Sequence, residues 1–257
     1  MSSKFSGPCG ENVSYVYNNG TLNISPDNPL RPSYMWEGFQ FPEHIRDNAE
    51  CVSVVDVPRI PSEAFRGFEA TEFYFGSQVR EIGEAALADC PNIEEIDLES
   101  VRLIEKEAFA NSGLINVKIE KGTRVEDRAF ENSALVSADI DATNIGARAF
   151  VNCDKLKYAT LGPNVKEIGN EAFSGTSLTG DINVEAEKVG YDVFGHNQDI
   201  KVTTPREEIA NLLTNEGIKA EVINDTTIDV VEEPVTVTVE EIDGTDFPGG
   251  NDDDPSW

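Results

Sequence analysis

One short phrase recurs seven times along the sequence, at intervals of 20 to 23 residues. It consists of a β-branched aliphatic residue, three mostly polar positions, a small residue and a large apolar residue. The copies are Ile60–Phe65, Ile82–Leu87, Ile104–Phe109, Val125–Phe130, Ile145–Phe150, Ile168–Phe173 and Val189–Phe194. So short a period predicts a solenoid, because one unit cannot bury its own apolar residues and must stack against its neighbours.

A second pattern follows each phrase: two apolar residues that flank one other position. Alternation over so short a run predicts a strand with one buried face. The pairs are Phe73 and Phe75, Ile96 and Leu98, Val117 and Ile119, Ala138 and Ile140, Ala159 and Leu161, Ile182 and Val184, and Ile200 and Val202.

A corner position lies three residues past the large apolar residue of each phrase. Six of its seven occupants are small or polar, which suits a place where buried backbone groups need hydrogen-bond partners. The column is Phe68, Cys90, Ser112, Ser133, Cys153, Thr176 and Asn197. Each unit is therefore expected to contain a turn, a short helical or irregular arm, a polar corner and a strand.

Glycine is the second residue of several copies, which predicts a tight turn there. Glu105 and Glu126 replace it in the third and fourth copies and do not favour such a turn.

The stretch from Ile145 to Leu161 contains Ile-Gly-x-x-Ala-Phe-x-x-Cys and then Leu with an apolar-x-apolar triplet. This stretch resembles the BspA-type leucine-rich repeat family, and the resemblance covers roughly residues 52–202. It implies an α/β-type solenoid whose leucine-rich repeats are about 20–23 residues long, each with one short parallel strand. It also implies a β-hairpin cap before the first repeat, because an open solenoid end would expose apolar side chains and a sheet edge.

Four segments are expected along the chain: an N-terminal β cap over 1–50, seven repeats over 51–204, a C-terminal cap over 205–224 and an acidic tail over 225–257. In the first cap, Asn19-Gly20 is a turn signal between two alternating runs. In the second, residues 205–217 have the pattern of an amphipathic helix, and a closing strand is expected after it. From about residue 244 the composition predicts disorder.

The charge of the chain limits its partners. The formal net charge is −28, and 12 of the 48 acidic residues lie in 221–257, so the body is acidic as well. We therefore expect no nucleic-acid partner. No run of about 18 to 20 apolar residues predicts a membrane-spanning helix, and the first nine residues lack the apolar stretch of a secretion signal. The family resemblance, by contrast, implies a secreted or cell-surface protein.

The four cysteines do not predict a zinc site, because none form a Cys-x-x-Cys pair. Cys90 and Cys153 occupy equivalent corners three units apart, or about 14 Å, which is too far for a disulfide. They are expected to be buried thiols. Cys9 and Cys51 both flank the N-terminal cap, and both a disulfide and two free thiols remain open for them.

Catalytic residues, metal ligands and cofactor-binding residues are not predicted. The two histidines, His44 and His196, are separated by most of the repeats, so they cannot share a site. A nucleophile–histidine assembly would need one of them beside an orienting acid. Phosphate-binding and dinucleotide-binding glycine patterns are absent from the sequence. We therefore expect a protein that is not an enzyme.

The strand face is the candidate binding surface, because solenoids display extended sheets of this kind. Its outward positions form two columns. The candidate residues are Glu72, Tyr74, Glu95, Asp97, Asn116, Lys118, Ser137, Asp139, Tyr158, Thr160, Asp181 and Asn183. Asp199 and Lys201 are expected to continue the columns.

Two interpretations of this face are open: a binding site, or a merely solvated sheet. Asp97, Lys118 and Asp139 are expected to be neighbours whose charges partly neutralise one another. Tyr74 and Tyr158 are the strongest binding candidates, because tyrosine combines a large contact area with a polar tip. Packing of these rings against neighbouring strands is the alternative.

Two functions follow. The first is a non-enzymatic recognition or adhesion module that binds a protein, such as a host-surface or extracellular-matrix component; adhesion is what the resemblance implies. The alternative is a structural scaffold in which the solenoid is a spacer and Val235–Val239 docks to a partner by strand addition. The sequence predicts no oligomeric state.

Overall fold

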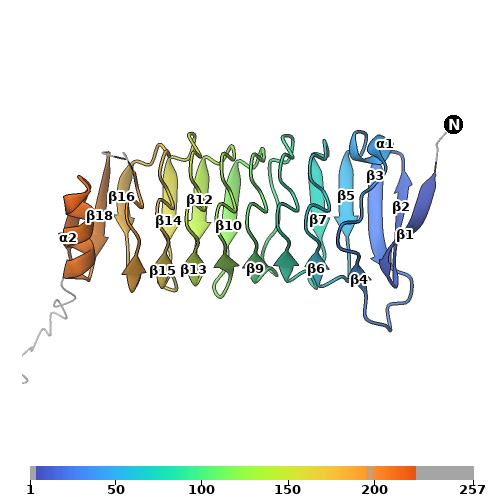
Figure 1. Ribbon diagram of the computed structural model, residues 1–257, viewed down its shortest axis with the longest axis horizontal. Coiled ribbons are helices and arrows are strands. Elements are labelled where there is room, and N and C mark those ends of the chain that lie inside the picture. The colour runs from blue at the N-terminus through green and yellow to red at the C-terminus, as the bar shows by residue number, and fades with distance from the viewer. Residues whose placement is uncertain (1–3, 196, 198, 224–257) are drawn as a thin grey trace, which may run out of the picture. The chain divides into compact units, whose positions relative to one another are not determined.

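The repeats form a solenoid in which each coil lies beside the next (Figure 1). The computed structural model describes residues 4–195, 197 and 199–223, which belong to the compact unit that ends at Asn224. The first residue of each phrase is the second residue of a two-residue strand, and the seven strands form one parallel sheet in the order β17-β15-β13-β11-β9-β8-β6. They are β6 (Arg59–Ile60), β8 (Glu81–Ile82), β9 (Leu103–Ile104), β11 (Arg124–Val125), β13 (Asn144–Ile145), β15 (Glu167–Ile168) and β17 (Lys188–Val189). The solenoid prediction is confirmed, and this sheet gives each repeat a strand that the sequence did not predict.

The expected strands lie on another side of each coil. They are β7 (Glu72–Phe75), β10 (Asn116–Ile119), β12 (Ser137–Ile140), β14 (Tyr158–Leu161), β16 (Gly180–Asn183) and β18 (Ile200–Thr204). They do not form one continuous sheet: β7 ends a six-stranded sheet, β10-β12-β14 form a second sheet, and β16-β18 belong to a third.

The strand predicted around Ile96 and Leu98 is wrong, because residues 93–98 adopt no strand conformation. Regular pairing there would set Glu95 directly opposite Glu72 in one outward column, and like charges in that position destabilise a sheet. The carboxylate of Asp97 instead accepts a hydrogen bond from the backbone N–H of Glu99, at 2.9 Å. This local bond favours a turn over a strand.

The register predicted for the last strand pair is also wrong. Ile182 lies opposite Val202 rather than Ile200, so Asp181 faces Lys201 and not Asp199. The first buried strand residue follows the large apolar residue of its repeat by eight or nine positions in the earlier units. Val202 keeps this spacing from Phe194, whereas Ile200 comes two residues too early.

The core contains a stack of phenylalanine rings from successive repeats. Phe109, Phe130, Phe150 and Phe173 stack with ring centroids 5.0–5.1 Å apart and planes within 5° of parallel. Phe194 continues the stack at 5.8 Å. All these rings are buried, so each coil covers the apolar face of its neighbour, as solenoid stacking requires.

The corner column satisfies buried backbone carbonyls, as its composition predicts. The thiols of Cys90 and Cys153 donate to the carbonyls of Phe65 and Phe130 in the preceding repeats, at 3.1 and 3.0 Å. The side-chain amide of Asn197 donates to the carbonyl of Phe173 at 3.2 Å. Each bond therefore links one coil to the next.

The N-terminal segment forms an antiparallel sheet that continues into the first repeat strands, in the order β4-β1-β2-β3-β5-β7. Its elements are β1 (Phe5–Glu11), β2 (Val13–Asn18), β3 (Thr21–Pro26), β4 (Tyr34–Met35), helix α1 (Glu43–Arg46) and β5 (Cys51–Val54). Asn19 and Gly20 connect β2 to β3 with φ values of 48° and 78°. Positive values at both positions are those of the type I′ turn that suits a two-residue hairpin.

A disulfide between Cys9 and Cys51 does not form, and all four cysteines are free. Cys9 lies on β1 and Cys51 on β5, with β2 and β3 between them. Three strand spacings separate the two residues by about 14 Å, beyond the reach of a disulfide.

At the other end, helix α2 (Glu207–Asn215) packs beside strand β19 (Lys219–Val222), which pairs in parallel with β18. Ile209, Ala210 and Leu213 form the buried face of α2. Gly217 has a φ of +86° and lets the chain turn back from the helix. The tail predictions, including Val235–Val239 and disorder from residue 244, lie outside the described residues, as does His196. Within the described part, no helix has the length and apolar character that crossing a bilayer requires.

Candidate binding face

The two predicted columns are aligned across β10, β12 and β14. Asn116, Ser137 and Tyr158 are paired in register, and so are Lys118, Asp139 and Thr160. The hydroxyl of Ser137 donates to the side-chain carbonyl of Asn116 at 2.7 Å. Because the residues between them, such as Val117 and Ala138, are buried, the columns point to solvent and form one continuous surface.

The two tyrosines of the face are exposed rather than packed into it. Tyr158 is 61% exposed and Tyr74 is 57% exposed. The Tyr74 hydroxyl donates to the carboxylate of Glu72 at 3.2 Å, and this bond raises the pKa of the tyrosine. Both rings therefore offer apolar area to a partner, which a buried cross-strand packing role would not.

The expected neutralisation among Asp97, Lys118 and Asp139 holds in part, although the main partner of Lys118 lies elsewhere. The ammonium of Lys118 forms its ion pair with Glu120 at 2.6 Å, on its own side of the sheet. This hydrogen bond is the main reason why the pKa of Lys118 is raised, and the charge of Asp139 also helps to raise it. Asp139 is next to Lys118 in register, but Asp97 is on the irregular segment and does not continue the column.

The remaining candidate residues lie beyond the central sheet. Glu72 and Tyr74 are on β7, at the edge of the N-terminal sheet. Asp181 and Asn183 are on β16, opposite Lys201 and Thr203. Gly180 has a φ of +87°, a left-handed conformation that ends regular strand geometry between β14 and β16. The structure thus divides the predicted face into three parts.

A groove of about 770 Å³ lies where the sheet is interrupted, between β7 and the segment 92–97. We call it the β7 groove. Its lining is Thr71, Glu72, Phe73, Tyr74, Phe75, Asn92, Glu94, Glu95, Ile96 and Asp97. Among the predicted site residues, the groove brings Glu72, Tyr74, Glu95 and Asp97 together. Glu94 was not among the predicted site residues. Its sequence signal was its position next to Glu95, which places two adjacent acidic residues at the start of the predicted strand.

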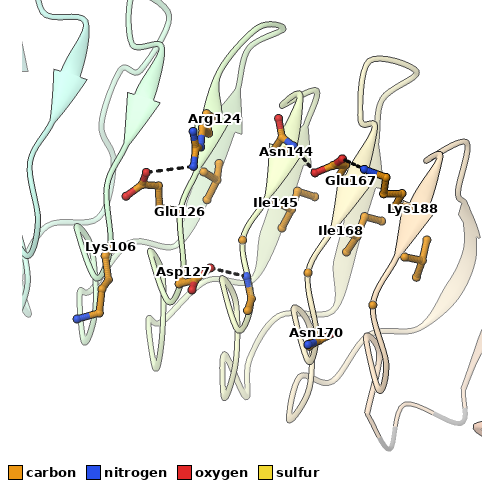
Figure 2. A pocket seen from close by; sticks show the side chains of 16 residues that line it. Lys106, Arg124, Glu126, Asp127, Asn144, Ile145, Glu167, Ile168, Asn170 and Lys188 are labelled. Carbon is orange, nitrogen blue, oxygen red and sulfur yellow. Dashed lines mark hydrogen bonds and ion pairs between the residues drawn. The ribbon is translucent and has the colours of Figure 1, made fainter.

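A second groove, of about 800 Å³, crosses the sheet of two-residue strands (Figure 2). Its charged lining is balanced by ion pairs. Glu167 accepts from the ammonium of Lys188 at 2.6 Å and from the amide of Asn144 at 3.0 Å, and Arg124 lies 3.6 Å from Glu126. This groove was not predicted, because strands of two residues give no periodic signal.

Three glycines line this second groove at points where adjacent coils come close together. A Cβ atom on Gly146 would lie 2.4 Å from the carbonyl carbon of Glu126, and Gly169 and Gly190 are similarly crowded. None of these three glycines has a positive φ. In the repeat that contains Gly146, the residue with a positive φ is Arg148, two positions later. The glycine column therefore serves close approach rather than the tight turn that the sequence suggested.

Within the described residues, no cluster of three or more histidine, cysteine or acidic side chains could hold a metal ion. His44 lies on α1, where its ring contacts Phe5 with centroids 4.4 Å apart. Arg59 is surrounded by carboxylates: its guanidinium contacts Glu37, Glu81 and Glu105. The hydrogen bond with Glu105 is the main cause of the raised pKa of Arg59, and this network joins three successive coils.

Comparison with known proteins places the fold. The chain is similar to a leucine-rich repeat protein from Eubacterium ventriosum, with a TM-score of 0.56 at 16% identity, over 79% of this chain and 72% of the other. It is also similar to a leucine-rich cell surface protein from Faecalibacterium prausnitzii, with a TM-score of 0.48 at 21% identity, over 78% of this chain and 56% of the other. A search of curated proteins found no match.

The family model of the BspA-type leucine-rich repeat region matches six copies, over residues 50–144 and 99–201. These ranges cover more than half of the sequence and contain both the phenylalanine stack and the aligned strand columns. Proteins built from such repeats commonly act in protein interaction or at cell surfaces and are typically not enzymes. The chain belongs to the BspA-type leucine-rich repeat family.

Proposed function

We propose that this protein is a non-enzymatic recognition module that binds a partner protein through its strand face. The observation that carries the proposal is the alignment of two outward columns across β10, β12 and β14, with Tyr158 exposed at one end. A rigid sheet presents these side chains without the entropy cost of ordering a loop. Tyrosine is enriched among the residues that dominate binding energy at protein interfaces.

The partner we propose is a protein of a host surface or of the extracellular matrix, so that the module serves adhesion. The family supports this choice, since proteins built from such repeats commonly act in protein interaction or at cell surfaces. The scaffold alternative depends on Val235–Val239, which lies outside the described residues.

The test is capture of proteins from an extracellular-matrix extract by the full chain. Two variants are compared: Tyr158→Ala with Lys118→Ala on the face, and Tyr191→Ala as a control. Tyr191 is 56% exposed and follows β17, away from the strand face. We expect the face variant to lose a protein that the wild type and the control both capture.

Equal capture by all three proteins, with unchanged thermal unfolding, would contradict the proposal. A chain that ends after residue 224 should bind as the full chain does. If that truncation abolishes binding while the face variant retains it, docking through the tail replaces recognition through the face.

A further inference from the structure

We propose that the β7 groove binds an extended, lysine- or arginine-bearing segment of a partner protein. This inference rests on the proposed function and deepens it, since it names the chemistry of the segment that one part of the strand face recognises. Three features of the groove carry it: free backbone groups along one wall, a uniform negative charge, and half-buried apolar side chains.

The first feature is the edge of β7. The backbone N–H groups of Glu72 and Gly76 donate to the carbonyls of Glu50 and Val54, on the β5 side. Because successive backbone groups of a strand point in opposite directions, those of Phe73 and Phe75 point toward the groove. Among the described residues, no backbone hydrogen bond joins residues 71–76 to residues 93–98.

These free groups are the ones that strand addition uses. An extended peptide laid along β7 would accept from its N–H groups and donate to its C=O groups, as in other cases where a peptide extends an exposed sheet edge. The neighbouring segment does not compete, because the carboxylate of Asp97 and the backbone N–H of Glu99 are joined in a local turn.

The second feature is charge. The groove is lined by the carboxylates of Glu72, Glu94, Glu95 and Asp97 and by no lysine or arginine. The groove in Figure 2 is different, since Lys106, Arg124 and Lys188 there balance three acids. A uniformly acidic groove on an acidic protein repels acidic partners and attracts cationic ones.

The third feature is the apolar part of the lining. Phe75 and Ile96 are half-buried in the groove, and Tyr74 stands exposed at its side. Alternate residues of an extended peptide point to opposite sides. Such a peptide can therefore place aliphatic side chains against Phe75 and Ile96 while its cationic side chains reach the carboxylates.

The probe for the test is a fluorescent peptide of about eight residues in which lysine and valine alternate, a length of roughly 26 Å when extended. Two control peptides accompany it: one with glutamate in place of lysine, and one with lysine and valine but N-methylated backbone amides. Binding is measured by fluorescence anisotropy at low ionic strength with the full chain.

The variant that tests the groove is Glu95→Gln with Asp97→Asn. Asparagine keeps the side-chain oxygen that accepts from Glu99, so the turn is retained. The matched control is Glu187→Gln with Asp154→Asn, which makes the same change in net charge at exposed residues that lie outside both the groove and the strand columns.

We expect the lysine–valine peptide to bind the wild type and the control variant alike, and the groove variant about tenfold more weakly. The glutamate peptide and the N-methylated peptide should bind at least about tenfold more weakly than the probe. Three results would overturn the inference: no binding of the probe, equal weakening by the control variant, or undiminished binding of the N-methylated peptide.

Failure of the groove inference can be distinguished from failure of the proposed function. If the groove variant still captures the matrix protein that Tyr158→Ala with Lys118→Ala loses, the strand face binds but the β7 groove does not. If the probe binds the groove and no matrix protein is captured, the cationic-peptide site stands and the adhesion proposal falls.

Discussion

Phe130 and Phe150 lie face to face, with ring centroids 5.0 Å apart and planes 1° from parallel. Their repeats are consecutive, and both rings are buried. The relationship repeats on either side with Phe109 and Phe173. Stability is therefore shared along the stack, since each ring depends on the coils beside it.

Replacing one ring of the stack should divide the solenoid. Phe150→Leu keeps an apolar side chain, as Leu87 does in its own repeat, and should lower the free energy of unfolding by about 1–2 kcal/mol. Phe150→Asp buries an unpaired polar group and should lower it by more than about 4 kcal/mol. Urea denaturation followed by circular dichroism measures both. Near-wild-type unfolding of Phe150→Asp would contradict the register of the repeats.

The corner column contains one unsatisfied hydroxyl. Within the described residues, the Ser112 side chain is buried without a hydrogen-bond partner, whereas the Ser133 hydroxyl is 3.2 Å from the thiol of Cys153. Ser112→Ala should leave stability unchanged or raise it slightly, and Ser133→Ala should cost about 1 kcal/mol. Thermal unfolding of the two variants provides the comparison. If Ser112→Ala lowers the melting temperature more than Ser133→Ala does, the hydrogen bonds of the polar column are arranged differently from those described.

A residue with positive φ recurs in the arm of every repeat. Arg128 has a φ of 57°, and Glu107 and Arg148 have equivalent values of 57° and 59°. A left-handed conformation costs residues with a Cβ atom about 1 kcal/mol relative to glycine. Arg128→Gly should therefore be more stable than Arg128→Ala by about 1 kcal/mol, since both lose the same side-chain contacts. A more stable alanine variant in denaturant titrations would contradict this backbone geometry.

The cysteines should differ in their reactivity. Burial raises the pKa of Cys9 and Cys90 to about 12 and that of Cys153 to about 11, so their thiolate forms are scarce at neutral pH. Burial raises the pKa of Cys51 as well, but this thiol is only half-buried and is therefore the one that a reagent can reach. A thiol reagent at pH 8 should modify one cysteine quickly and the other three only after denaturant is added. Cys51→Ser should remove the fast reaction, and a fast reaction that persists in that variant would place the accessible thiol elsewhere.

One ion pair between repeats should make stability depend on pH. The guanidinium of Arg148 donates to both carboxylate oxygens of Glu171, at 2.8 and 2.9 Å, and holds the pKa of Glu171 below its ordinary value of 4.5. The pair therefore stabilises the folded state above pH 4.5, and the contribution disappears as the pH falls through the lowered pKa. Glu171→Gln should lower the melting temperature at pH 7 but not at pH 2.5. Arg148→Met should behave in the same way, and a difference that persists at pH 2.5 would assign the effect to packing.

Much of the fold follows from the sequence because stacking makes a local demand that every repeat must meet. Phe150, Cys153 and Ala159 occupy positions that the repeat assigns to a buried arm, a polar corner and a strand, and the structure places them there. The exposed columns of β10, β12 and β14 follow from the same alternation. In these three repeats, the side chains that lie next to one another across the strands have charges and sizes that are compatible with regular strand pairing.

Only the tertiary structure decided where this regularity ends. Glu72 and Glu95 each suit an outward position in their own repeat, and their conflict arises only when the coils lie side by side. The register of Val202, the second groove and the unsatisfied hydroxyl of Ser112 likewise depend on which atoms of adjacent coils meet. The sequence by itself determined the period, the buried columns and the solenoid, because burial is a requirement of each unit. Contacts between the units decided the breaks in the sheet, and with them the shape and charge of the candidate binding face.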